Sequence, residues 1–237
     1  MSIEFNQRPE TYLLKERYDA PKDVFIFFKE LLERSELGQS DSALSLTDFG
    51  CATGELLYFL KNEYPQAQLT GIDNSHDLLS KASQSEFLEG IRFVNANALS
   101  YLSEKQDVVT CFGMLGIFDD FEELFESLIK NTRKGGRIYI HGLFNDDDID
   151  VRVYYKDKKN DCDWNRGFNI FSCETISQFL KSKGLDWTFH DFEMSTELKK
   201  NQDYPHRAYT ETLGSGKKVT VNGLCLILPE KILEIVC

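Results

Sequence analysis

The amino-acid sequence predicts an α/β fold, in which a mainly parallel β-sheet is flanked by helices. Short apolar stretches typical of buried strands alternate with longer stretches that carry apolar residues at helical spacing. This alternation continues from residue 44 to about residue 145, and it is the pattern of parallel sheets whose strands are joined by crossover helices. A glycine-containing turn separates the first strand from the first helix of the alternation, as expected where the chain reverses at the edge of such a sheet.

Composition limits both the size of the fold and its partners. The 237 residues are 41% hydrophobic, which is enough to bury the core of one domain. The formal net charge of −12 argues against a nucleic-acid partner, because proteins that bind phosphate backbones usually carry a basic surface. No apolar stretch has the length of a membrane span, and the first residues show no signal-peptide pattern, so we expect a cytoplasmic protein that does not bind a membrane.

We divide the single expected domain into three parts. Residues 1–43 form an N-terminal helical cover, residues 44–145 the α/β core, and residues 146–237 the remainder, with an insertion and the closing strands. Apolar periodicity and turn signals predict the elements in order: a helix over 23–33, a strand from 44, a helix from 55, a strand over 69–73, a helix from 74, a strand over 90–94, a strand with its exit loop over 107–115, a helix over 118–130, a glycine turn and strand over 134–141, a helix over 172–184, a strand over 186–194, a hairpin over 209–221, and closing stretches 224–228 and 232–236, of which the second is the final strand or its continuation.

The turn after the first strand is the most informative motif. The segment Asp48-Phe-Gly-Cys-Ala-Thr-Gly54 ends that strand, and the following helix begins with Glu55. Glycine at Gly50 and Gly54 permits a sharp bend and lets a ligand approach main-chain atoms. The spacing is neither G-x-G-x-x-G nor the G-K-[ST] ending of a P-loop. Because an acid in the first helical turn opposes a phosphate there, we predict a site for a cationic or neutral small molecule.

The second strand of the unit ends in another acid, Asp73. A carboxylate at this place accepts hydrogen bonds from both hydroxyl groups of a ribose. Together with the glycine turn, Asp73 therefore predicts a nucleoside site that lacks a diphosphate.

At this point residues 44–145 resemble the class I, Rossmann-like S-adenosylmethionine-dependent methyltransferases. The first motif of that superfamily is an acid, a glycine, two or three small residues and a second glycine, and its second motif is an acid that ends strand two. The resemblance implies a seven-stranded sheet whose last strand is antiparallel, an N-terminal helical segment over the cofactor and an insertion after strand five. It also implies that residues 44–145 bind S-adenosylmethionine, with S-adenosylhomocysteine as the product.

The resemblance also implies which residues hold the cofactor. Asn97 stands where the family commonly has an aspartate that bonds the adenine amino group, and an amide oxygen can still accept that bond. Tyr18, together with Tyr12 and Arg17, is a candidate for the methionyl carboxylate. The full set of cofactor-binding candidates is Asp48, Gly50, Cys51, Gly54, Asp73, Asn74, Asn97, Ala98, Phe112 and Tyr18.

Two histidines are candidates for catalysis. His141 ends the predicted fifth strand, at the sheet edge where open α/β sheets bind ligands, and His206 lies between the sixth strand and the hairpin. Either could act as a general base for an acceptor hydroxyl, whereas an anionic acceptor oxygen needs no base.

Cationic and aromatic residues gather after the fifth strand, although the protein is acidic overall. Arginine can hold a carboxylate or phosphate with two parallel hydrogen bonds, so this cluster suits a small anionic acceptor. The substrate-binding candidates are Arg152, Tyr154, Trp164 and Arg166 from this cluster, and Arg207 and Tyr209 from a second cluster after the sixth strand.

No metal site is expected. The six cysteines and four histidines lack zinc-ligand spacing, and the acidic run Asp146-Asp-Asp-Ile-Asp150 is interpreted as a solvated loop.

The function that follows is S-adenosylmethionine-dependent methylation of an oxygen or nitrogen of a small, polar and possibly anionic metabolite. Two alternatives stay open. One is a nicotinamide (NAD)-dependent oxidoreductase: Tyr155 and Lys159 match Y-x-x-x-K, the catalytic pair of short-chain dehydrogenases, but the glycine pattern of that family is missing at the first turn. A cofactor-binding protein without catalysis would instead regulate another enzyme. The sequence predicts no oligomeric state.

Overall fold

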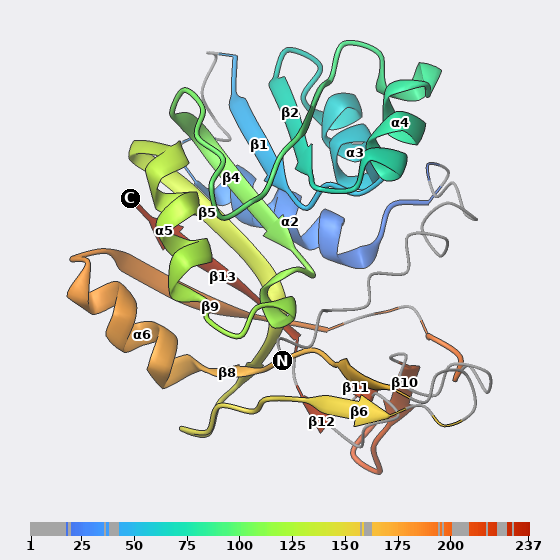
Figure 1. Ribbon diagram of the computed structural model, residues 1–237, viewed down its shortest axis with the longest axis vertical. Helices are drawn as coiled ribbons and strands as arrows, with labels where there is room; N and C mark the ends of the chain where they lie inside the picture. The colour runs from blue at the N-terminus through green and yellow to red at the C-terminus, as the bar shows by residue number, and fades with distance from the viewer. Residues whose placement is uncertain are drawn as a thin grey trace.

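The computed structural model describes residues 18, 20–35, 37, 43–156, 158, 163–193, 195, 197–200, 209–216, 218–221, 227–228 and 230–237. In this part of the chain the centre of the molecule is one sheet, with strand order β3-β2-β1-β4-β5-β13-β9 (Figure 1). The strands are β1 (Ser45–Phe49), β2 (Gln68–Asp73), β3 (Arg92–Asn95), β4 (Gln106–Phe112), β5 (Thr132–Asn145), β9 (Asp186–Phe192) and β13 (Glu230–Val236), and the short β8 (Phe171–Ser172) pairs with the end of β5.

The pairing directions confirm the predicted topology. Strands β1 to β5 pair in parallel. The last strand, β13, lies between β5 and β9 and runs antiparallel to both. The closing stretch 232–236 is therefore the final strand of the main sheet, whereas Ile227–Leu228 forms β12 of a smaller sheet.

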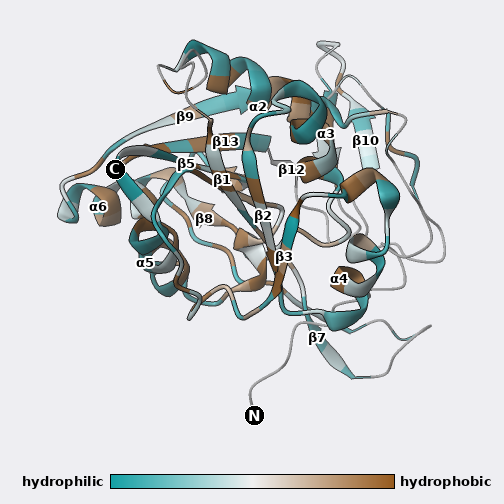
Figure 2. Ribbon diagram, turned by 90° about the horizontal axis from the view of Figure 1, so that it is seen from above, coloured by the Kyte–Doolittle hydropathy of each residue, from teal (hydrophilic) through white to brown (hydrophobic). Residues whose placement is uncertain are grey.

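Helices cover both faces of this sheet (Figure 2). The α-helices are α2 (Asp23–Arg34), α3 (Glu55–Glu63), α4 (His76–Ser83), α5 (Glu122–Asn131) and α6 (Cys173–Ser182), and the 3-10 turns are η2 (Glu86–Leu88) and η3 (Leu115–Ile117). Helices α2 and α3 share one buried cluster with the sheet, and α5 and α6 share the other. Helix α2 buries Phe28 and Leu32 completely, so this part of the predicted N-terminal cover is also a layer of the core.

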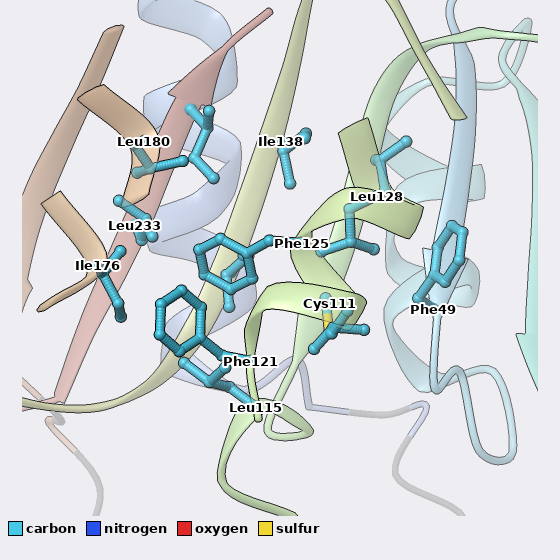
Figure 3. Close-up of a cluster of buried hydrophobic side chains, with 14 of the residues drawn as sticks. Phe49, Cys111, Leu115, Phe121, Phe125, Leu128, Ile138, Ile176, Leu180 and Leu233 are labelled. Atoms are coloured by element: carbon cyan, nitrogen blue, oxygen red, sulfur yellow. The ribbon is translucent and has the colours of Figure 1, made fainter. Parts of the chain in front are cut away.

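The core beneath α5 and α6 is rich in aromatic side chains. Phe121 and Phe125 pack edge to face, with ring centroids 5.1 Å apart, and Phe121 also contacts Phe179 of α6 at 5.4 Å. Figure 3 shows Phe125 lying between the helices and the strand residues Ile138 and Leu233. Burial of this apolar surface holds both helices against the strands that lead to the carboxyl edge of the sheet.

Two small antiparallel sheets lie beyond that carboxyl edge, toward which β4 and β5 run (Figure 1). One is the hairpin of β6 (Tyr154–Lys156) and β7 (Trp164–Arg166). The other contains β10 (Tyr209–Thr212), β11 (Lys218–Val221) and β12. We call these two sheets the edge sheets. They come from the insertion and the closing segment, and they lie at the edge where parallel sheets bind ligands.

Helix α6 begins at a serine cap that local sequence signals predict. The Thr175 amide donates to the Ser172 hydroxyl oxygen at 2.9 Å, and the Ser172 side chain is fully buried. In the α4 cap, the Leu78 amide lies 3.5 Å from the Ser75 hydroxyl oxygen. The two helices therefore offer a short and a long version of the same interaction.

We expect Ser172→Ala to lower the free energy of unfolding by about 1–2 kcal/mol, because it leaves the Thr175 amide without its acceptor. Ser75→Ala is the matched control and should cost less, since its bond is longer. Urea denaturation of both variants measures the difference. An equal effect of the two substitutions would contradict this account of the α6 cap.

Candidate functional site

The turn after β1 adopts a backbone that few residue types tolerate. Gly50, Ala52 and Gly54 have φ angles of +75°, +47° and +81°. A Cβ on Gly50 would lie 2.5 Å from the Met114 sulfur, so a larger residue there would push the Met114 side chain aside and would be strained at this positive φ. The amides of Gly50 and Cys51 donate to the Ile72 carbonyl at 2.8 and 3.0 Å. The turn is therefore fixed against the end of β2.

Asp73 joins this turn to the loop after β2. Its Oδ2 accepts a bond from the Ala52 amide at 3.0 Å, and its Oδ1 accepts one from the Ser75 amide at 2.8 Å. An ionised carboxylate has about four acceptor positions, so two of them stay available for ribose hydroxyls. Asn74, the neighbouring candidate, is exposed beside Asp73.

Asp48 is buried beneath the same turn. Its Oδ1 accepts a 2.7 Å bond from the Thr110 hydroxyl on β4. Burial, and to a smaller extent the nearby charge of Asp73, raises the pKa of Asp48 to about 7, although the Thr110 bond and Lys22 act in the opposite direction. A buried carboxylate here would be favoured in its ionised form by a cationic ligand.

Cys51 contributes to the turn through its backbone. Its side chain is buried, and its sulfur lies 2.7 Å from the position that a Cβ on Gly71 would take. Burial raises the pKa of this thiol well above the ordinary value. The Cys51 side chain therefore packs under the turn as a neutral group, so that only its main-chain atoms are placed to face a ligand.

Tyr18 and Lys22 of the N-terminal segment lie against the glycine turn and the start of α3. The Tyr18 hydroxyl donates to the Thr53 carbonyl at 3.3 Å, and its ring lies 4.6 Å from that of Tyr58. Lys22 forms a 2.6 Å ion pair with Glu55, the first residue of α3. Local sequence does not predict this pair, because Lys22 precedes α2 and Glu55 begins α3. The related candidates Tyr12 and Arg17 lie outside the described residues.

The remaining cofactor candidates lie on the loops after β3 and β4. Asn97 is exposed, and its Oδ1 accepts a 2.9 Å bond from the Leu99 amide, which leaves one acceptor position for an adenine amino group. The Ala98 carbonyl accepts from the Ser127 hydroxyl at 2.6 Å. Phe112 ends β4 and packs edge to face with Phe28 of α2 at 5.4 Å.

His141 on β5 lies against the ring of Phe112, which we call the Phe112 wall. The two ring centroids are 5.6 Å apart, and Phe192 of β9 meets the imidazole edge on at 5.9 Å. His141 Nε2 is 3.1 Å from Oε2 of Glu230, the first residue of β13. Glu230 is not predictable from local sequence, because its contact with His141 depends on how two distant strands pair. His206, the other catalytic candidate, lies outside the described residues.

The arginines of the insertion already meet a carboxylate of the chain itself. Arg152 and Arg166 both form ion pairs with Asp119, which follows η3, and the Arg152 pair measures 3.4 Å. Asn169, which is buried, donates to Asp119 Oδ1 at 3.2 Å and to the Phe118 carbonyl at 2.8 Å. These donors fasten the insertion to the β4 exit loop. From the sequence the two arginines are expected to be free for an acceptor, but both already pair with Asp119. An anionic acceptor that binds them must therefore compete with Asp119.

The aromatic substrate candidates lie on the edge sheets. Tyr154 pairs with Arg166 in the hairpin, and Trp164 pairs with Lys156, so these side chains share one face, on which Tyr154 and Trp164 are exposed. Tyr209 begins β10, and the Lys200 ammonium lies 4.9 Å from its ring centre. Arg207 and Lys159 lie outside the described residues.

The acidic run after β5 has structural contacts. Asp150 accepts from the Ser172 amide at 2.6 Å and from the Thr175 hydroxyl at 3.1 Å, which supports the start of α6. Asp146 forms a 3.2 Å ion pair with Lys231. Within the described part of the chain, no group of three or more His, Cys, Asp or Glu residues is arranged to hold a metal ion. The described helices include none that is long and apolar enough to cross a membrane.

The strand order, the antiparallel β13 and the glycine turn tied to Asp73 define the fold class of the class I methyltransferases. Solved structures agree with this assignment. The YcgJ protein from Bacillus subtilis has a TM-score of 0.60 at 11% identity, over 90% of this chain and 97% of that one. Magnesium protoporphyrin IX methyltransferase from Synechocystis, solved with bound S-adenosylmethionine, has a TM-score of 0.55 at 15% identity, over 90% and 77%.

Residues 18–192 match the family model of a methyltransferase domain, which is more than half of the chain. The chain belongs to this family. Among curated relatives, trans-aconitate 2-methyltransferase of Azoarcus sp. is 26% identical over 53% of this chain and 48% of the relative. Malonyl-[acyl-carrier protein] O-methyltransferase of Priestia megaterium is 21% identical over 84% and 73%. The chain spans about half or less of the length of the trans-aconitate enzymes that it matches.

The raised pKa of Asp48 predicts a pH-dependent stability. The folded protein keeps this carboxyl protonated up to about pH 7, whereas an unfolded chain ionises it near the ordinary value of 3.8. The folded state therefore binds the extra proton, and the contribution of Asp48 to stability falls as the pH rises through this window. We expect the free energy of unfolding of the unliganded protein, relative to Asp48→Asn, to fall by about 2 kcal/mol between about pH 5.5 and about pH 8.

Urea denaturation of both proteins at the two pH values measures this difference. The Asp48→Asn variant is the control for every other titrating group, because its side-chain amide does not titrate and its amide oxygen still accepts a bond from the Thr110 hydroxyl. A difference between the two proteins that stays constant with pH would show that Asp48 is ionised in the folded state throughout.

Proposed function

We propose that this protein transfers a methyl group from S-adenosylmethionine to an oxygen or nitrogen of a small polar metabolite. The observation that carries the proposal is the left-handed turn at Gly50 to Gly54, which is bonded to the Asp73 carboxylate at the carboxyl edge of the sheet. Membership of the methyltransferase domain family supports the same reaction. So do two neighbouring structures that were solved with S-adenosylmethionine or S-adenosylhomocysteine bound.

The described residues fit this cofactor. Asp73 keeps acceptor positions for the ribose, and the β4 exit at Gly113 has open space where a Cβ would stand, so the backbone can approach a ligand there. Asp48 and Tyr18 flank the turn on which the methionyl part would lie. Bound S-adenosylmethionine supplies a methyl group that its sulfonium already activates. What remains for the protein is to align the acceptor and to exclude water.

The acceptor is proposed to bind between the core and the edge sheets. Arg152 and Arg166 approach the β4 exit loop from the insertion, and Tyr154, Trp164 and Tyr209 stand on the edge sheets. Arg207 and His206 are proposed for the same pocket from sequence alone. Two relatives methylate trans-aconitate and a malonyl-carrier conjugate, which supports a polar acceptor that carries acidic groups.

Incubation with methyl-labelled S-adenosylmethionine and a fractionated metabolite pool tests the proposal. We expect label to appear in a small polar product, and the unlabelled cofactor product to accumulate in equal amount. Binding of S-adenosylhomocysteine without transfer to any fraction would instead favour the regulatory alternative. A melting temperature raised by NAD(H) but not by S-adenosylhomocysteine would favour the oxidoreductase.

His141 is proposed as the general base for the acceptor. We expect His141→Gln to lower kcat by about 100-fold or more while the affinity for S-adenosylhomocysteine changes little, because a base acts only on the acceptor. His190→Gln is the matched control. His190 also pairs with a glutamate, Glu234, at 2.9 Å, but it lies on β9 away from the Phe112 wall. Equal losses of rate in the two variants would contradict a catalytic role for His141.

A further inference from the structure

Glu230 connects the candidate base to an edge sheet. Its Oε2 lies 3.1 Å from His141 Nε2, and its Oε1 accepts a 2.5 Å bond from the Thr220 hydroxyl on β11. The exposed fractions of the His141 and Glu230 side chains are 17% and 13%, so little water reaches the contact. Both oxygens of one nearly buried carboxylate therefore have partners, one on the main sheet and one on the edge sheet.

Strand register explains why this acid meets this histidine. Ile232 of β13 stands opposite His141 of β5, so Glu230, two residues earlier, lies diagonally beside His141 on the same face. The imidazole is also held between Phe112 of β4 and Phe192 of β9. Three strands therefore restrict the ring, and the carboxylate fixes which nitrogen points toward β13.

The charge on Glu230 decides the tautomer of His141. Burial by itself raises the pKa of Glu230, but hydrogen bonds with His141 and Thr220, and attraction to a protonated His141, outweigh burial and lower the pKa below its ordinary value. An ionised carboxylate only accepts hydrogen bonds, so Nε2 of His141 must carry the proton. In the neutral ring the lone pair then lies on Nδ1, which becomes the basic atom.

A second glutamate of β13, Glu234, also contacts a histidine, but its other partners differ from those of Glu230. Glu234 contacts His190, but it also forms an ion pair with Arg137 and accepts a 3.3 Å bond from the Tyr139 hydroxyl. A permanent cation therefore shares Glu234. The corresponding second partner of Glu230 is the neutral hydroxyl of Thr220 on an edge sheet. The full charge of Glu230 is left to orient and stabilise the imidazole of His141.

We propose that Glu230 is a positioning residue that holds His141 with its lone pair on Nδ1. Thr220 completes the hydrogen bonds of Glu230 when the edge sheet is docked. The acceptor therefore reacts through a hydroxyl group, which needs a base. The inference rests on the proposed function. In the step, the acceptor oxygen forms a bond to the methyl carbon, and the carbon–sulfur bond breaks with its electron pair left on sulfur. The hydroxyl proton passes to His141 Nδ1, and the resulting imidazolium pairs with the Glu230 carboxylate.

The first test needs no acceptor. Nitrogen-15 NMR of the histidine side chains reports which ring nitrogen carries the proton, and the His141→Gln spectrum identifies the His141 signals. We expect neutral His141 in the intact protein to be protonated at Nε2 and to become a mixture of tautomers in Glu230→Gln. The matched control Glu234→Gln should change the His190 signals and leave those of His141 in place. Protonation of His141 at Nδ1 in the intact protein would overturn the proposal.

The second test uses the labelled transfer to the metabolite pool. We expect Glu230→Gln to lower the maximal rate at least about tenfold, with the apparent KM for the pool and the affinity for S-adenosylhomocysteine within about twofold. Thr220→Val removes one hydroxyl and should lower the maximal rate less, by about threefold to tenfold. If Glu230→Gln does not fold, the rate of Thr220→Val tests the positioning role instead.

The experiments separate the positioning role of Glu230 from methyl transfer itself. Transfer by the intact protein with an unchanged maximal rate in both variants overturns the positioning role and leaves methyl transfer standing. A labelled product that is a methyl ester of a carboxylate overturns the hydroxyl assignment, because such an acceptor oxygen is already anionic. Absence of any labelled product from the intact protein overturns the proposed function itself, whereas the NMR test still decides the role of Glu230.

Discussion

The structure depends on one carboxylate, that of Asp73, which accepts amide bonds from two turns at once. Ala52 in the first turn has a positive φ, and Ser75 in the second caps α4, so Asp73 connects a strained loop to the start of a helix. Both amide bonds are partly buried, so loss of their acceptor would destabilise both turns. The same acid retains the acceptor positions that a ribose requires. Structural and binding roles thus meet in one side chain.

Local patterns predict a large part of this arrangement. The glycines of the first turn are predictable because a sharp bend between strand and helix favours residues that tolerate a positive φ, as Gly50 and Gly54 do, and Asp73 is predictable because it ends an apolar strand. Ser172 is recognisable as a cap from its position before a helix. The antiparallel final strand, in contrast, followed from the family resemblance, and the pairing of β13 with β5 confirms it.

Other features depend on contacts between distant segments, which no local pattern encodes. Glu230 meets His141 only because β13 enters between β5 and β9 in one register, and a shift of one residue would place the acid on the opposite face. From the sequence, Arg152 and Arg166 are expected to be free to bind an acceptor anion, but in the fold both form ion pairs with Asp119. The helix predicted to begin at residue 118 begins at Glu122, because η3 ends at Ile117 and the Phe118 carbonyl bonds Asn169 instead of continuing a helix.

Calorimetric titration with S-adenosylhomocysteine tests the central claim, that the turn and Asp73 together hold a nucleoside. The account predicts saturable binding at one site and a loss of affinity of at least about tenfold in Asp73→Ala, since hydrogen bonds to a charged group contribute about 1.5–3 kcal/mol each. Asp77→Ala, which removes an exposed acid from the first turn of α4, should bind as the intact protein does. Absence of binding to the intact protein, or equal affinity in Asp73→Ala, would contradict the account.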